Sequence, residues 1–231
     1  MTRQQFRTLL YKEMHDLRSN GQALVLLFIP FSGLASLFFQ DRSPSWSFLI
    51  IFTLMFLPLF MMGFLLVQEK EQRTWRLLHQ QGYKLTSLLS VKALLACVIT
   101  LASCFVIAWL GGVSLFFSIL VVLYSIPCVL MMLSLGALLG ALSKNTIEVS
   151  FWGTPIIIIF IALEIINRLL SNHEWSFLMK LLPNHVFAEG LENIVEAPGA
   201  AFVYPFFYFI FLAGVFALLA LYMLRKRAYT F

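Results

Sequence analysis

The chain has 231 residues, of which 61% are hydrophobic and 12% carry a formal charge. Soluble domains carry roughly 25% charged residues, so this chain has about half the charge needed to cover a water-facing surface, and an ordinary soluble fold is excluded. Basic residues beside anionic lipid account for the net charge of +5, which needs no nucleic acid to explain it, and three scattered cysteines predict neither a disulfide framework nor a metal site.

The spacing of apolar residues predicts an amphipathic helix over residues 1–21, ahead of the first long apolar run. Five apolar residues recur at helical spacing: Phe6, Leu9, Leu10, Met14 and Leu17. Basic residues such as Arg3, Arg7 and Lys12 fall elsewhere on the same cylinder. We expect an interfacial helix that lies along the membrane surface before the chain enters the bilayer.

Long uncharged runs predict six membrane spans in an all-α integral membrane protein, with residues 1–231 as a single transmembrane domain. A span needs about 20 apolar residues, and the run Ala93–Ser143 has 51 residues without a charge, enough for two helices. Gly111 and Gly112 supply the turn between those two. The predicted spans lie near residues 23–40, 46–67, 90–110, 113–141, 149–170 and 203–224.

The basic residues predict the orientation of these spans. Six spans put both termini on one side, which then holds 13 of the 16 basic residues, whereas only Arg42, Arg168 and Lys180 lie on the other side. Because cytoplasmic loops carry the excess of lysine and arginine, both termini are expected in the cytoplasm.

The longest cytoplasmic connection on this model is residues 68–90. Its first half, Glu69–Gln80, predicts a helix, and Gly82 predicts its end. Trp75, Leu77 and Leu78 give this helix an apolar patch. The patch indicates either a docking surface for another protein or a helix that lies on lipid.

The predicted external segment, residues 171–202, indicates two short amphipathic helices in the outer interface, separated at Pro183 and Asn184. This segment contains four glutamates and one basic residue, Lys180, so its net charge is −3. An acidic outer surface attracts cationic substrates, and it also serves simply to keep a surface solvated.

A few polar residues and glycines stand out within the spans. Glu164 and Arg168 are four residues apart in the fifth span, beside Asn167, so they either pair in a pathway or gate, or anchor the helix end in water. Gly136 and Gly140 form a G-x-x-x-G pattern in the fourth span, which favours close helix packing.

Motifs for catalysis are missing from the sequence. It has no G-x-x-x-x-G-K-[ST] phosphate loop, no H-E-x-x-H, no G-x-S-x-G and no histidine or cysteine cluster. We therefore expect no catalytic or metal site and no directly bound cofactor in this chain. Energised work would need a partner or an ion gradient.

The loop after the second span resembles that of ABC type-2 exporter permeases. The resemblance rests on Glu69-Lys70-Glu71-Gln72-Arg73-Thr74, then Leu77-Leu78, then Lys84, and then Lys92 at the head of the next span. The leader with Lys12-Glu13 and the Leu182-Pro183 step are also similar to the family. One departure is that Gln80-Gln81-Gly82 stands where the family usually carries a proline in the turn.

The resemblance implies the transmembrane subunit of an ATP-driven exporter in a bacterial cytoplasmic membrane. Such a subunit pairs with a second permease, identical or a sister chain, and with separate ATPase subunits that hold ATP and Mg. It also implies ATPase docking by part of the loop, namely Glu69, Glu71, Arg73, Thr74, Trp75, Arg76 and Leu78. In the leader, Phe6, Leu10, Lys12 and Glu13 correspond to the interfacial helix.

The implied substrate is a small amphipathic or hydrophobic molecule, such as an antimicrobial peptide, an antibiotic or a drug, moved outward. Two other classes remain as alternatives, an intramembrane enzyme and an ion-coupled carrier.

Overall fold

The computed structural model describes residues 3–19, 21, 24–28, 46–72, 74–169, 182–194 and 198–228. Within these ranges the chain consists of helices joined by turns, with no strand. The helices are α1 (Arg3–Ser19), α3 (Trp46–Glu71), α4 (Thr74–Gln80), α5 (Leu85–Leu110), α6 (Leu115–Leu142), α7 (Thr146–Leu169), α9 (Pro183–Asn193) and α10 (Pro198–Ala228).

Four of the six predicted spans are confirmed as helices long and apolar enough to cross a membrane. They are α3, α5, α6 and the Val203–Lys226 part of α10. The fifth predicted span corresponds to α7, whose Thr146–Ala162 part is apolar. Only residues 24–28 of the first predicted span are described, and they are helical; the rest of it lies outside the described residues.

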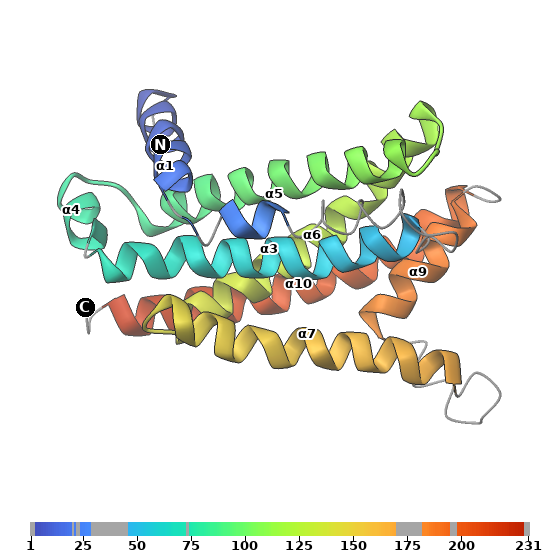
Figure 1. Cartoon of the computed structure of the whole chain (residues 1–231). Coiled ribbons are helices and arrows are strands. Elements are labelled where there is room, and N and C mark those ends of the chain that lie inside the picture. Colours follow the sequence, from blue (N-terminus) through green and yellow to red (C-terminus); the bar gives the residue numbers. More distant parts are fainter. Residues whose placement is uncertain are drawn as a thin grey trace.

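The long helices run alongside one another, and the short helices lie at the two ends of this bundle (Figure 1). α3 is the most enclosed of the four spanning helices and packs against α5, α6 and α7. α1, α4 and the last turns of α10 lie at one end, which we call the α4 end, and α9 lies at the other, the α9 end.

Glycines end two of the helices as predicted. Gly112, at φ +84°, closes the turn between α5 and α6, and Gly82, at φ +81°, follows α4. After Gly82, the Tyr83 N–H donates to the Leu78 carbonyl at 3.1 Å, the hydrogen bond of a left-handed C-cap. Because glycine takes a positive φ at little cost, this turn forms without a proline.

The helix predicted over Glu69–Gln80 is wrong as a single element. α3 continues to Glu71, where the Gln72 N–H still donates to the Gln68 carbonyl at 3.0 Å, and α4 then begins separately at Thr74. The hydroxyl of Thr74 donates back to the Glu69 carboxylate. This side-chain contact competes with continued helix and fixes the break.

Of the two short helices predicted within residues 171–202, the second is confirmed as a helix, α9, whereas the first falls on residues outside the described ranges. Its apolar residues Val186, Phe187, Leu191 and Ile194 are at most 2% exposed. The expectation that this face lies in the lipid interface is therefore wrong, because helices of the chain itself cover it. One of the contacts is from the Tyr124 hydroxyl of α6, 3.3 Å from the Val186 and Phe187 carbonyls.

The two glycines of the G-x-x-x-G pattern lie where α6 meets α3. A Cβ atom on Gly136 would overlap the carbonyl oxygen of Leu59, and one on Gly140 would lie 2.9 Å from the Cβ of Leu66. The two backbones therefore approach so closely that neither position has room for a side chain.

Substituting Gly136→Ala is expected to lower the free energy of unfolding by about 1–3 kcal/mol, the usual range for overpacking a tight contact, since the rigid backbone of α3 must move. Gly214→Ala in α10 is the control, because no atom lies within 4 Å of its added methyl group. Thermal unfolding in detergent, followed by circular dichroism, compares the two. An equal loss in both variants would contradict the close α3–α6 contact.

Candidate functional site

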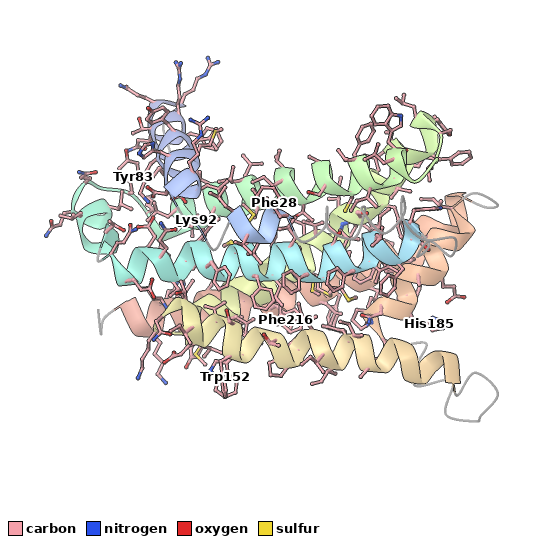
Figure 2. The ribbon with its side chains drawn as sticks, in the orientation of Figure 1. Phe28, Tyr83, Lys92, Trp152, His185 and Phe216 are labelled. Carbon is pink, nitrogen blue, oxygen red and sulfur yellow. The ribbon has the colours of Figure 1, made fainter. Side chains whose placement is uncertain are left out.

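Charged side chains from three helices meet at the α4 end and form what we call the ion cluster. Its members are Lys12, Glu13 and Asp16 from α1, Glu69 from α3 and Lys92 from α5. Three of them are almost fully buried: Glu13 is 1% exposed, and Glu69 and Lys92 are each 2% exposed. Figure 2 shows Lys92 below α1, between the ribbons of α1 and α3.

Two ammonium groups hold the cluster together. Lys92 Nζ lies 2.7 Å from Glu13 Oε2 and 3.0 Å from Glu69 Oε1. Lys12 Nζ donates to the same Glu69 oxygen and lies 3.0 Å from Asp16 Oδ2 and 3.3 Å from Glu13 Oε1. The cluster therefore ties α1, the end of α3 and the start of α5 to one another.

The surroundings of Lys12 keep it charged. Burial alone lowers the pKa of this lysine, but the carboxylates of Glu13, Glu69 and Asp16 outweigh burial and hold the pKa above its usual value of 10.5. The ammonium group therefore stays protonated at any physiological pH.

An apolar cluster lies beside the buried residues of the ion cluster. Leu9 of α1 is 2% exposed and packs with Leu78 of α4 and with Leu88 and Val91 of α5. Glu13 follows Leu9 by four residues, so both point to the same side of α1. The predicted leader helix is confirmed as α1, and part of its apolar stripe packs on α4 and α5.

Phe6 and Leu10 of the leader helix are half-buried against the same apolar cluster. Met14 is 48% exposed and Tyr11 is 75% exposed, so α1 also keeps an outer apolar side. The leader thus contacts the body of the protein with one face and presents a second face to its surroundings.

The carboxylates of Glu13, Asp16 and Glu69 approach within 4.8 Å of one another, a spacing that a metal ion also needs. In this protein the ammonium groups of Lys12 and Lys92 bind these oxygens. The geometry fits an ion-pair network, because the positive charge that would stabilise the three carboxylates is already supplied by lysine.

Lys70, next to Glu69, binds the end of α6. Its Nζ atom donates to three backbone carbonyls: Gly140 at 2.6 Å, Ala141 at 3.1 Å and Ser143 at 3.0 Å. The last carbonyls of a helix lack partners within it and carry the negative end of the helix dipole. An ammonium group is therefore a favourable cap for α6.

Glu71 binds the start of α7, where the backbone N–H groups lack partners, just as Lys70 binds the carbonyls that end α6. Its Oε1 accepts a hydrogen bond from the Thr146 N–H at 2.9 Å, and the Thr146 hydroxyl lies 3.4 Å away. Asn145 also caps this helix, with its Oδ1 accepting from the Glu148 N–H at 2.8 Å. Negative charge at a helix N-terminus complements the positive end of its dipole.

These three consecutive residues form what we call the Glu69–Glu71 junction. Successive residues of a helix point about 100° apart, so Glu69, Lys70 and Glu71 face three different directions from the last turn of α3. Glu69 binds α1 and α5, Lys70 binds α6, and Glu71 binds α7. Thr74, bonded to Glu69, adds α4.

The residues implied to dock an ATPase fall into different environments. Glu69 and Leu78 are 2% and 9% exposed and make their contacts inside the chain. Glu71 is exposed but bonded to Thr146, and Thr74 is half-buried. Leu77, on the outer side of α4, is 60% exposed.

Part of the implied docking set falls beyond what the structure describes. Arg73 lies outside the described residues, and Trp75 and Arg76 lie on α4 with side chains that are likewise outside them. The polar trio Glu164, Asn167 and Arg168 lies on the last two turns of α7, again with undescribed side chains. α7 continues through this trio to Leu169.

Two pairings that complete the site were not predicted from the sequence. One is the ion pair of Lys92 with Glu13, and the other is the binding of Lys70 to the end of α6. One signal was available for Lys92, which is the only charged residue between Lys84 and Lys144. A lone charge inside an apolar run requires a buried partner. The sequence gives no comparable sign that Lys70 caps α6.

Removing one charge of the cluster is expected to destabilise the protein strongly. Lys92→Met leaves Glu13 and Glu69 buried with one lysine fewer, and breaking such a pair costs about 3–5 kcal/mol. The double variant with Glu13→Gln is expected to lose less than the sum of the two single losses, because it removes both partners. Thermal unfolding of the four proteins in detergent measures this cycle, and additive losses would contradict the pairing.

Comparison with known proteins identifies the family. No curated protein matches the sequence. The family model described as ABC-2 family transporter protein matches residues 44–222, which is most of the chain and includes the junction, α4 and the helices from α3 to α10. The chain therefore belongs to the ABC-2 transporter family, whose members are membrane-spanning permease subunits that work with an ABC ATPase.

Proposed function

We propose that this chain is the permease of an exporter that moves a small amphipathic or hydrophobic molecule outward, with ATP and Mg bound by a separate ATPase subunit. The Glu69–Glu71 junction is the observation that carries the proposal, because it links α4 to α1, α5, α6 and α7 and to α3 itself. A force applied to α4 by a partner outside the membrane would therefore be transmitted to the long helices at the α4 end.

The outer side of α4 is the proposed docking surface for the ATPase. Leu77 is 60% exposed, and Gln72, Gln80 and Gln81 beside it are also exposed. Leu78, the next residue, is on the inner side, packed on Leu9 and Leu88. We therefore assign Leu77 to the partner surface and assign Leu78 and Glu69 to the contacts that hold α4 in place.

The proposed transmission of movement from α4 to the other helices depends on contacts that are costly to break. Glu69 accepts hydrogen bonds from Thr74 at the start of α4 and from Lys12, and it forms an ion pair with Lys92. A displacement of α4 therefore acts on α1, α3 and α5 together. Pulling a buried charge from its partner costs about 3–5 kcal/mol, which makes joint movement the less costly response. Lys70 and Glu71 extend the same unit to α6 and α7.

α7 carries the proposed movement from the junction to the outer gate. Glu71 binds its first turn, and its last two turns hold Glu164, Asn167 and Arg168. Just before them, the Asn184 side chain of α9 donates to the Phe160 carbonyl at 2.7 Å. The α9 end of α7 and α9 itself would form the gate, between this chain and a second permease that is either identical or a sister subunit.

Leu77→Ala and Leu78→Ala form a matched pair of adjacent substitutions. Leu77→Ala is expected to leave the thermal unfolding temperature unchanged and to abolish co-purification of an ABC ATPase subunit that co-purifies with the parent protein. Leu78→Ala is expected to lower the free energy of unfolding by about 2–5 kcal/mol, because it empties a packed site.

If Leu77→Ala still captured the ATPase at the parent level, α4 would be a helix that lies on lipid. Transport by the purified chain in vesicles without any ATPase would instead favour an ion-coupled carrier, and turnover of a substrate would favour an intramembrane enzyme.

The gate is tested by Glu164→Gln, which keeps the shape of the side chain and removes its charge. If the Glu164 charge acts on the substrate, the variant should lose substrate-stimulated ATP hydrolysis while basal hydrolysis persists. Ser150→Ala, near the opposite end of α7, is the control. Unchanged stimulation in Glu164→Gln would remove this residue from the pathway and leave it as a helix anchor.

A further inference from the structure

A groove opens on the side of the bundle between α5 and α10. Its volume is about 260 Å³, its floor is formed by α6 and one residue of α3, and its walls are α5 and α10. The lining residues are Met62, Thr86, Leu89, Ser90, Ala93, Leu130, Leu133, Ser134, Ala137, Ala217, Ala220 and Leu221. The groove belongs to the α4 end, since it lies near the start of α5 and the last turns of α10 (Figure 1).

Small side chains create the groove, and its walls are apolar. Alanines line it from three helices, and each leaves space that a larger residue would fill. The hydroxyls of Ser90 and Ser134 donate to carbonyls of their own helices, both at 2.8 Å, so they are already paired. An empty apolar groove forfeits van der Waals contacts, so an apolar ligand gains free energy by filling it.

Basic side chains stand at the end of the groove. Arg225 follows the groove-lining Leu221 by four residues, which places it on the same side of α10 and about 6 Å further along the helix axis. Lys226 and Lys84, the residue ahead of α5, are also at this end, and all three are exposed. A single site therefore combines an apolar slot with cationic groups directly beyond it.

We propose that the groove binds one acyl chain of an anionic phospholipid from the leaflet at the α4 end, with the lipid phosphate beside Arg225 and Lys84. The volume lies below the roughly 300–1,000 Å³ of pockets that enclose whole drug-sized ligands, which fits a single alkyl chain. Basic pockets between spanning helices bind anionic headgroups.

A second copy of the chain fits this surface less well than a lipid does. Two copies related by a two-fold axis along the membrane normal would bring their α4 ends to the same side of the membrane, and the same surface would face itself. Arg225 and Lys84 of one copy would then approach those of the other, and like charges repel. An anionic lipid has the opposite charge at that depth.

Native mass spectrometry of the detergent-purified protein tests the proposal. The probes are phosphatidylglycerol and phosphatidylcholine with identical acyl chains. The parent protein is expected to bind phosphatidylglycerol about fivefold more tightly, the ratio that corresponds to about 1 kcal/mol from one basic group. Arg225→Gln is expected to abolish this preference, whereas Arg7→Gln on the exposed side of α1 leaves it intact.

Filling the groove tests where the acyl chain lies. Ala217→Leu and Ser90→Leu, on opposite walls, are each expected to weaken both lipids about tenfold, while Ala102→Leu, on an exposed part of α5 outside the groove, has no effect. Circular dichroism verifies that every variant is folded.

Equal binding of the two lipids by the parent, or unchanged binding after both groove-filling substitutions, would overturn the proposal. An intermolecular disulfide between cysteines placed at Thr86 and Ala217 would also overturn it, because a second copy would then occupy the groove.

Discussion

The arrangement at the α4 end depends on the burial of Lys92 between the carboxylates of Glu13 and Glu69. An ammonium group in apolar surroundings is stable only while its partners stay in place, since the desolvation cost of each ion is several kcal/mol. α1, α3 and α5 therefore keep their relative positions as long as this pairing holds. The position of α4 follows from it, because Thr74 bonds to Glu69 and Leu78 packs on Leu9.

A short charged motif serves as a junction because of helix geometry. In a loop, Glu69, Lys70 and Glu71 would be solvated, and they would bind nothing in particular. On the last turn of α3 the same residues diverge by about 100° each and find an ion cluster, the carbonyls ending α6 and the amides beginning α7. The pairings of Lys70 and Glu71 satisfy backbone groups that a helix end leaves without partners. In the proposed exporter, the same contacts that stabilise the fold also transmit movement.

The features of this protein that the sequence predicts are those determined by residues close together in the chain. The lengths of the uncharged runs predicted the four confirmed spans, and the glycines predicted the turns at Gly82 and Gly112. Both signals lie within a continuous stretch of the chain. The pairing of Lys92 with Glu13 joins residues 79 positions apart, and no local pattern encodes it. An amphipathic pattern also does not distinguish lipid from protein as the cover of an apolar face. For that reason the pattern of α9 indicates lipid as the cover of its apolar face, and the pattern of α4 does not distinguish Leu77 from Leu78.

If the Glu69–Glu71 junction holds α4 and the start of α7 as one unit, the distance between these two elements stays constant while the proposed ATPase partner binds nucleotide. Spin labels at Gln80 of α4 and Ile147 of α7, both exposed, report this distance by pulsed electron paramagnetic resonance in a chain whose three cysteines are replaced. We predict the same narrow distance distribution in the ATPase complex without nucleotide and with a non-hydrolysable ATP analogue. We also predict a broad distribution when Lys70→Met and Glu71→Gln are combined. A shift of the distance on nucleotide binding in the parent protein would show that α4 and α7 move separately.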